Sequence, residues 1–175
     1  MVLNCSFRWA VSEEATAVSD MINNAYRGEQ SKLGWTSEAH LLDGLRTTPQ
    51  EILDLINRPD SIILLCHCKS ELLGSVHLQK HLDTAYLGMF VVRPTLQTQG
   101  IGKQILQAAE SEATLHWQVN KVAMYVISVR YELLAFYQRR GYIRTGGFRA
   151  FPVNPVMWQP KMENLQLELL EKYFA

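Results

Sequence analysis

Apolar residues along the chain recur with two different periods, and the shorter period predicts strands. Several short runs rich in apolar and β-branched residues stand between segments with turn-forming Gly or Asp, as strands of a sheet do. We expect strands at residues 3–10, 61–68, 73–80, 85–92, 122–129 and 165–174. The three central runs follow one another closely enough to form hairpins.

The longer period, close to 3.6 residues, predicts helices. In the first helix Ser12 has the place of an N-cap, Glu residues occupy the first turn, and Gly28 can end the helix. Its apolar positions are Ala15, Val18, Met21, Ile22 and Ala25. A second, short helix is expected to begin with Thr36 or Ser37 as its cap.

Three further helices carry their own start or stop signals. "TPQE" at 48–51 supplies a Thr cap, a Pro at the first helical position and a Glu at the third. "YELLAFYQRR" at 131–140 reads as a helix that Gly141 stops. The helix between them has its apolar positions at Ile101, Ile105, Leu106, Ala108, Ala109 and Leu115.

The order of these elements predicts the fold class. A run of hairpins followed by two βαβ-like passages implies an α/β protein, α+β in some schemes, in which a mixed sheet has helices on both faces. The length of 175 residues favours one domain that spans residues 1–175.

Composition and charge exclude several classes of protein. Apolar residues make up 47% and charged residues 19%, which is typical of a globular chain. Basic and acidic residues balance at 17 each, and no basic stripe is present, so we expect no nucleic-acid partner. The apolar runs are too short to cross a membrane. The N-terminus shows no signal-peptide pattern, and a cytoplasmic location is expected.

The three cysteines are interpreted as buried thiols. Cys66 and Cys68 flank His67 in a strand-like run, where alternation sends both thiols to one face. A zinc site needs about four ligands, and the sequence has no second cluster to supply them. We therefore expect no metal, and free thiols suit a reducing compartment.

The segment "VVRPTLQTQGIGKQIL", residues 91–106, joins a strand to a helix through a loop with two glycines. A strand that leads into a helix in this way leaves unpaired N–H groups at the helix start, which favours phosphate binding. A Walker loop would need Gly at 97 and Ser or Thr at 104, where the chain has Gln97 and Gln104. A dinucleotide fingerprint would need Gly in place of Ile105.

The remaining pattern, Gln/Arg-x-x-Gly-x-Gly/Ala at residues 97–102, resembles the acetyl-CoA loop of the GNAT superfamily of N-acetyltransferases. A second element, "AFYQRRGY" at 135–142, resembles the later helix of that family, which carries a tyrosine near the thiol of CoA. The stretch between them, with one helix and one strand, also matches. Many relatives have Asn where this chain has Arg130, which could reach a CoA phosphate or face solvent.

The resemblance implies the GNAT fold, a mixed, mostly antiparallel seven-stranded sheet flanked by about four helices. It implies acetyl-CoA as co-substrate, an amine as acceptor, and a monomer or homodimer. The residues it assigns to acetyl-CoA are Phe90, Val91, Val92, Gln97, Thr98, Gln99, Gly100, Ile101, Gly102 and Lys103.

In GNAT enzymes the acceptor amine attacks the thioester directly. Removing the proton from an alkylammonium group with a pKa of about 10.4 costs about 4–5 kcal/mol at pH 7. A backbone N–H, from Val91 or Val92, can stabilise charge on the carbonyl oxygen. The resemblance makes Tyr137 the acid that protonates the departing thiolate, and the alternative is a tyrosine packed on an amphipathic helix.

The general base is open, because the strand "AYLGMFVV" lacks the acidic residue that many relatives carry there. Glu38, His77, His81 and Ser128, the last through water, are the possible replacements.

The acceptor side is usually built by the first two helices of the family. "GWTSEAHLLDGLR" places three candidates there: Trp35 as an apolar wall, Glu38 for a cation and Arg46 for a carboxylate. The alternative is a capped surface helix with Trp35 buried.

The sequence therefore predicts an N-acetyltransferase for a small primary amine. Two alternatives remain open, namely acetylation of a protein N-terminus or lysine, and a non-catalytic acyl-CoA-binding regulatory domain.

Overall fold

The computed structural model describes residues 3–175 and contains a seven-stranded sheet in the order β1-β3-β4-β5-β6-β9-β7. Its strands are β1 (Ser6–Trp9), β3 (Ser61–Cys68), β4 (Glu71–His81), β5 (Thr84–Val92), β6 (Lys121–Ile127), β7 (Ile143–Ala150) and β9 (Gln166–Tyr173). β5 and β6 pair in parallel, and the other neighbours pair antiparallel. A separate two-stranded sheet pairs β2 (Leu42–Gly44) with β8 (Trp158–Pro160).

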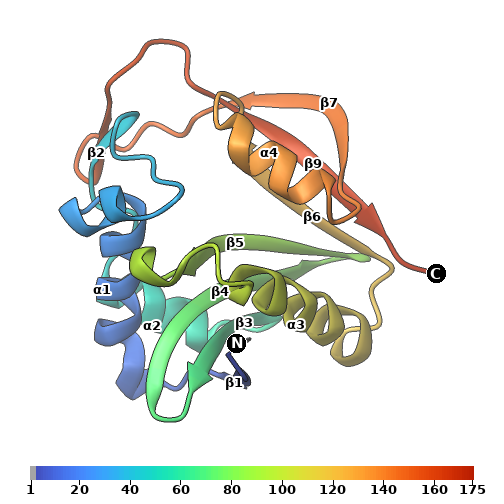
Figure 1. Ribbon diagram of the computed structural model, residues 1–175. Helices are drawn as coiled ribbons and strands as arrows, with labels where there is room; N and C mark the ends of the chain where they lie inside the picture. The colour runs from blue at the N-terminus through green and yellow to red at the C-terminus, as the bar shows by residue number, and fades with distance from the viewer. Residues whose placement is uncertain (1–2) are drawn as a thin grey trace.

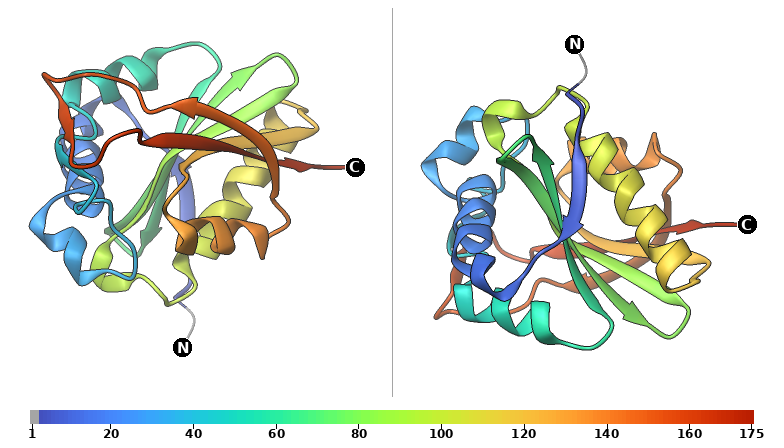
Figure 2. Two further views of the ribbon diagram at one scale, coloured as in Figure 1. Left: turned by 90° about the horizontal axis from the view of Figure 1, so that it is seen from above. Right: turned by 90° about the horizontal axis from the view of Figure 1, so that it is seen from below.

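Helices cover both faces of the large sheet (Figures 1 and 2). They are α1 (Ala15–Tyr26), α2 (Pro49–Asn57), α3 (Ile101–His116) and α4 (Tyr131–Gln138), with short 3-10 helices η1 (Ser12–Glu14), η2 (Glu29–Leu33) and η3 (Pro94–Leu96). Because strand side chains alternate, Ile63 and Leu65 pack with α1 and α2, whereas Ile62 and Leu64 pack with α3 and α4. The predicted fold class is confirmed.

The six predicted strands are present, and three further strands have no clear signal in the sequence. β7 is largely exposed and contains Gly146 and Gly147, so its apolar pattern is weak. β2 and β8 have three residues each, fewer than a periodic pattern needs.

The predicted helix after Thr36 or Ser37 is wrong. The chain closes a single turn, in which the N–H groups of Leu41 and Leu42 donate to the Glu38 carbonyl, and then enters β2. Both leucines are buried against Leu165 and other apolar residues near β9, so tertiary packing overrides the local preference for a helix.

Of the two predicted N-caps, Thr48 and Ser12, only Thr48 caps its helix. Thr48 caps α2 as expected, and its hydroxyl accepts from the Glu51 N–H at 3.1 Å. Ser12 does not cap: it lies inside η1, and the Glu14 carboxylate accepts from the Val11 N–H at 3.0 Å instead. The Glu14 side chain therefore satisfies the N–H of the N-cap residue Val11, while the bond expected from Ser12 to the first turn is not made.

The prediction of buried thiols is confirmed for Cys66, whereas Cys5 and Cys68 are half-buried. The thiols of Cys5, Cys66 and Cys68 are free, and all three residues pack on the same core cluster. Cys66 is fully buried, and this burial raises the pKa of its thiol. Within residues 3–175, no helix combines the length and apolar character needed to cross a membrane.

The two parallel strands separate near the middle of the sheet. β5 and β6 pair only from Thr84 and Lys121 to Leu87 and Met124. Beyond this point they diverge, as Figure 1 shows. A bulge in β5 accompanies the divergence, since two residues, Met89 and Phe90, lie opposite one residue of β4. A bulge redirects side chains and often lies beside a functional site.

Candidate active site

Two cavities meet where β5 and β6 separate. The first, of about 450 Å³, lies between the loop 97–103 and α4, and we call it the loop-side cavity. The second, of about 540 Å³, lies between β4, β5, β6 and the small sheet, and we call it the strand-side cavity. Five residues line both cavities: Tyr26, Phe90, Arg130, Leu133 and Tyr137. A molecule in one cavity can therefore approach a molecule in the other.

The start of α3 forms one wall of the loop-side cavity. Gly100 adopts a left-handed φ of 81° at the N-cap, a conformation that glycine adopts without strain. The first N–H of the helix that donates a helical hydrogen bond is that of Gln104, which donates to the Gly100 carbonyl at 3.2 Å. The N–H groups just before it have no helical acceptor, and with the helix dipole they form a site suited to phosphate.

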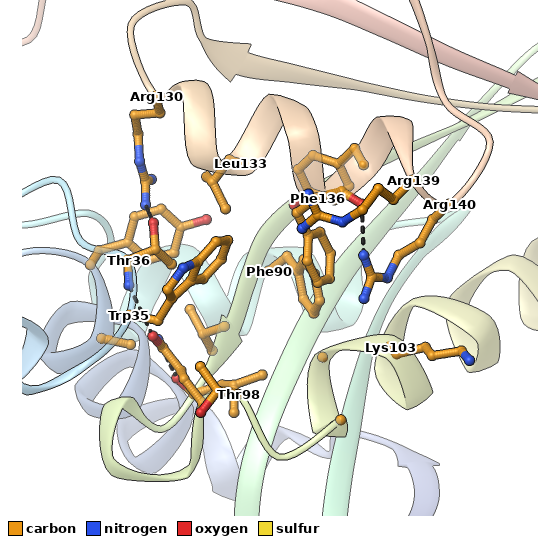
Figure 3. Close-up of a pocket in the computed structure, with 18 residues that line it drawn as sticks. Trp35, Thr36, Phe90, Thr98, Lys103, Arg130, Leu133, Phe136, Arg139 and Arg140 are labelled. Atoms are coloured by element: carbon orange, nitrogen blue, oxygen red, sulfur yellow. Dashed lines mark hydrogen bonds between the residues drawn. The ribbon is translucent and has the colours of Figure 1, made fainter.

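Basic side chains surround the same cavity, and the sequence analysis did not identify two of them. Lys103, Arg139 and Arg140 line it, and its lining contains no Asp or Glu among the described residues. Arg140 lies 3.5 Å above the Phe136 ring and donates to the Phe136 carbonyl at 2.7 Å (Figure 3). Its buried Nε has no hydrogen-bond partner within residues 3–175. The pair of arginines directly before Gly141 was the feature of the sequence that could have indicated these two basic residues.

The predicted loop is placed at this cavity with two exceptions. The lining includes Phe90, Val91, Val92, Gln97, Thr98, Gly100, Gly102 and Lys103. Gln99 is exposed outside the lining, and the Ile101 side chain is buried in the core. Gln97 braces the loop, because its side chain accepts from the Thr36 N–H at 3.1 Å and donates to the Val92 carbonyl at 3.3 Å.

Gly102 keeps the cavity open beside the aromatic rings. A Cβ at this position would lie 3.6 Å from Phe136, Phe90 and Val92, which is ordinary contact. A small side chain would therefore fit the protein itself but would occupy space that faces the helix start. The free N–H groups, the three basic side chains and the glycines fit a phosphorylated ligand such as CoA.

Tyr137 lies at the junction of the two cavities. It extends from α4 and is almost fully buried, and it lies beside Phe90 at a ring distance of 6.3 Å. Burial, with a smaller contribution from Tyr26, raises the pKa of the Tyr137 hydroxyl well above its usual value. The phenol is therefore protonated at neutral pH and can donate a hydrogen bond.

Tyr26 is a second phenol at this junction, and the sequence analysis did not identify it. It is the last residue of α1 and lines both cavities. Burial raises the pKa of its hydroxyl, and the positive charge of Arg46 opposes this effect. The apolar periodicity of α1 gave no reason to separate Tyr26 from the packing residues.

Arg130 does not face solvent, which was one of the two positions considered for it, but lines both cavities. It is buried, and it donates to the Thr36 hydroxyl at 2.6 Å and to Glu38 at 3.4 Å. Glu38 also accepts from Arg27 at 2.8 Å. The side chains of Glu38, Arg27 and Arg130 are 4%, 3% and 8% exposed, so these three residues form a buried ionic triad.

The three predicted acceptor residues do not share one cavity. Glu38 and Arg46 line the strand-side cavity, whereas Trp35 lines the loop-side cavity, 6.1 Å from the Phe136 ring. Trp35 is 45% exposed rather than buried. The Arg46 guanidinium lies 5.5 Å from the Tyr26 ring centroid.

The candidate bases lie in different surroundings. His77 and His81 line the strand-side cavity, whereas Ser128 lines neither cavity. His77 is bonded to the Ser61 hydroxyl at 2.9 Å, and burial, followed by the charges of Arg46 and Arg58, lowers its pKa to about 4. Such a histidine is uncharged at neutral pH but is a weak base. Within residues 3–175, no three His, Cys, Asp or Glu side chains are grouped to hold a metal ion.

Three solved structures have a similar fold and are distant in sequence. The ribosomal-protein-S18-alanine N-acetyltransferase from Escherichia coli has a TM-score of 0.72 at 12% identity, covering 98% of this chain and 95% of that chain. The PaiA N-acetyltransferase from Thermoplasma acidophilum, in complex with coenzyme A, has a TM-score of 0.69 at 16% identity, covering 98% and 99%. A spermidine N-acetyltransferase chimera from Vibrio cholerae and hSSAT has a TM-score of 0.70 at 13% identity, covering 97% and 95%.

No protein with a curated function matches the chain in sequence. The model of the acetyltransferase (GNAT) domain family, in contrast, matches residues 43–152, which is more than half of the chain. The matched region contains the loop 97–103, Tyr137 and the strands that separate. The chain therefore belongs to the GNAT acetyltransferase family and is an acyltransferase.

Proposed function

We propose that this protein transfers the acetyl group of acetyl-CoA to the primary amine of a small molecule, by direct attack in a ternary complex. The observation that carries the proposal is the meeting of two cavities at Tyr137, one suited to a phosphorylated ligand and one open to an acceptor. Two substrates bound on either side of this junction would have their reacting atoms close together.

The loop-side cavity is the proposed site for acetyl-CoA, which supplies the acetyl thioester. The N–H groups at the start of α3 and the side chains of Lys103, Arg139 and Arg140 would bind its phosphates. The apolar rings of Phe90 and Phe136 would exclude water beside the reacting end. Exclusion of water strengthens the electrostatic interactions that stabilise developing charge.

Two groups of the protein would stabilise charge during the reaction. The side of β5 beyond Leu87 has no strand partner toward β6, so a backbone N–H there, that of Val91 or Val92, is proposed for the carbonyl oxygen. Tyr137, whose raised pKa keeps it protonated, is proposed to donate to the departing thiolate.

The strand-side cavity favours a small acceptor over a protein. Its volume of about 540 Å³ lies within the usual range for small-molecule sites. Phe151, Pro152 and Trp158, from the segment that leads into the small sheet, form part of its wall. The names of similar structures include both a ribosomal-protein alanine and spermidine as acceptors, so their likeness leaves the acceptor open.

Thiol release from acetyl-CoA in the presence of a panel of small amines tests the proposal. We expect calorimetry to show binding of acetyl-CoA alone, and mass spectrometry to show one acetyl group on the amine that supports thiol release. Acetylation of unfolded lysine-containing peptides in preference to every small amine would favour the protein-directed alternative. Absence of acetyl-CoA binding would overturn the proposal.

A further inference from the structure

The strand-side cavity has an unbalanced set of charged residues. Four arginines line it, Arg27, Arg46, Arg130 and Arg149, against the single acidic residue Glu38. Arg130 also pairs with Glu132, which lies outside the lining, at 3.5 Å, so an excess of two positive charges remains. Glu38 is committed to Arg27 and Arg130 in the buried triad. The remaining two arginines have no acidic partner within residues 3–175.

These two arginines come from separate segments and each lies against an aromatic ring. The guanidinium of Arg46, just after β2, lies 5.5 Å from the ring centroid of Tyr26. The guanidinium of Arg149, in β7, lies 3.6 Å from the ring centroid of Tyr125 in β6. Contact with a ring restricts the rotation of a long side chain, while it leaves the N–H groups along the guanidinium edge available to a ligand.

The backbone around Arg46 is held in place as well. The side-chain oxygen of Asn23 accepts from the N–H groups of Arg46 and Thr47 at 2.8 and 3.1 Å, and its amide donates to the Thr47 carbonyl at 3.0 Å. Three hydrogen bonds from one α1 side chain thus fix the position from which Arg46 extends. A binding group that is held in advance loses less entropy when its ligand arrives.

We propose that the acceptor is a small amine that also carries an anionic group, a carboxylate or a phosphate, which Arg46 and Arg149 bind. This inference rests on the proposed function and names the class of its acceptor. The planar guanidinium binds either anion through paired hydrogen bonds. A polyamine, with several positive charges and no anion, would be repelled by the excess of arginines.

Matched pairs of amines test the inference. L-Phenylalanine is compared with its methyl ester and with 2-phenylethylamine, and each of the other common amino acids is compared with its methyl ester. O-Phosphoethanolamine is compared with ethanolamine. Spermidine serves as the polycation. Within each pair, we expect kcat/KM for the amine that carries the anionic group to exceed kcat/KM for the amine that lacks it by at least about 10-fold. The carboxylate and phosphate pairs show which anion is preferred.

Variants connect this preference to the two arginines. Arg46→Met and Arg149→Met are each expected to raise KM about 10–100-fold for the anionic acceptor, with little change in kcat and no change in KM for its methyl ester. Arg149 is exposed, so its variant is expected to fold. Lys69→Met removes the same charge from an exposed position outside both cavities and is expected to leave both KM values unchanged.

The outcomes separate the two proposals. If acetyl-CoA binds and only ester, decarboxylated or polycationic amines release thiol, the inference on the acceptor is overturned and the proposed function stands. An equal rise in KM for the acid and its ester in both arginine variants would also overturn the inference. If acetyl-CoA does not bind, or no amine of any charge releases thiol, the proposed function fails and the inference fails with it.

Discussion

The buried triad of Glu38, Arg27 and Arg130 provides a prediction about stability. Replacing Glu38 with Gln keeps the size of the side chain and one acceptor oxygen, but removes the negative charge between two guanidinium groups. Those guanidinium side chains are only 3% and 8% exposed, so water has little access to them, and of the two only Arg130 keeps another acidic partner, Glu132 at 3.5 Å. We therefore expect Glu38→Gln to lower the free energy of unfolding substantially.

The expected size follows from the burial and the chain length. Removing one partner of a buried ion pair costs about 3–5 kcal/mol. Unfolding entropy of about 2.1 cal/mol/K per residue gives about 0.37 kcal/mol/K for 175 residues. The melting temperature should therefore fall by about 8–14 °C, provided that unfolding is two-state and reversible.

Glu29→Gln is the matched control for this experiment. Glu29 pairs with Lys32 at 2.8 Å, the same distance that separates Glu38 from Arg27, but its side chain is 89% exposed. An exposed pair contributes about 0–1 kcal/mol, so Tm should change by no more than about 3 °C. Thermal unfolding followed by calorimetry or circular dichroism measures both variants. Equal shifts in Tm for Glu38→Gln and Glu29→Gln would refute the argument that burial makes this triad structural.

Three further predictions concern the junction and its surroundings. Tyr137→Phe should lower kcat about 10²–10⁴-fold, whereas Tyr142→Phe, which removes a hydrogen bond to a buried carboxylate, should reduce stability and not the chemical step. Gly102→Glu should abolish acetyl-CoA binding in calorimetry while the protein stays folded, and Gly102→Ala should bind more weakly than wild type but detectably; wild-type affinity in folded Gly102→Glu would contradict the site. Because the pKa of His77 is lowered to about 4, the unfolded chain binds more protons at this residue than the folded chain does between pH 4 and about 6.5. The free energy of unfolding should therefore fall as the pH drops from about 6.5 to 4. Denaturant titrations in which His77→Asn keeps the same dependence on pH would show that another group is responsible.

The parts of the site that the sequence predicted are those that local geometry determines. A strand, a glycine in a left-handed conformation and a helix start lie within about a dozen residues, so the loop 97–103 could be recognised from its letters alone. Gly100 has a φ of 81°, which other residues adopt only with strain, and this explains the glycine at the helix start. The strand-to-helix wall of the loop-side cavity is thus encoded in one continuous segment.

The charged groups of the strand-side cavity could not be predicted in the same way. Glu38 and Arg130 are 92 positions apart, and nothing in either segment indicates that they meet. Arg149 lies in the exposed strand β7, whose apolar pattern is weak. Its neighbour Tyr125 belongs to β6, and α4 separates the two strands in the sequence. Only the three-dimensional arrangement shows that one carboxylate faces four arginines.

Trp35 shows a different limit of the sequence. It was grouped with Glu38 and Arg46 because all three lie in the segment that corresponds to the first two helices of the family, which usually build the acceptor side. The segment contains no helix, and the side chains of Trp35 and Glu38 enter different cavities. The position of a residue in this segment therefore did not predict which cavity its side chain lines.

The excess of arginines also bears on how the acceptor amine loses its proton, for which the chain has no acidic residue on β5. At an effective dielectric constant of about 20, a positive charge about 8 Å from an ammonium group raises its energy by about 2 kcal/mol, or about 1.5 pKa units. The free base costs about 4–5 kcal/mol at pH 7, so one such uncompensated charge would supply somewhat less than half of it. A carboxylate on the acceptor would bring the molecule into this field, and the one positive charge left unpaired would still act on the amine. A weakly basic residue or water would then suffice as the proton acceptor, which is consistent with a cavity whose buried histidine, His77, has a lowered pKa.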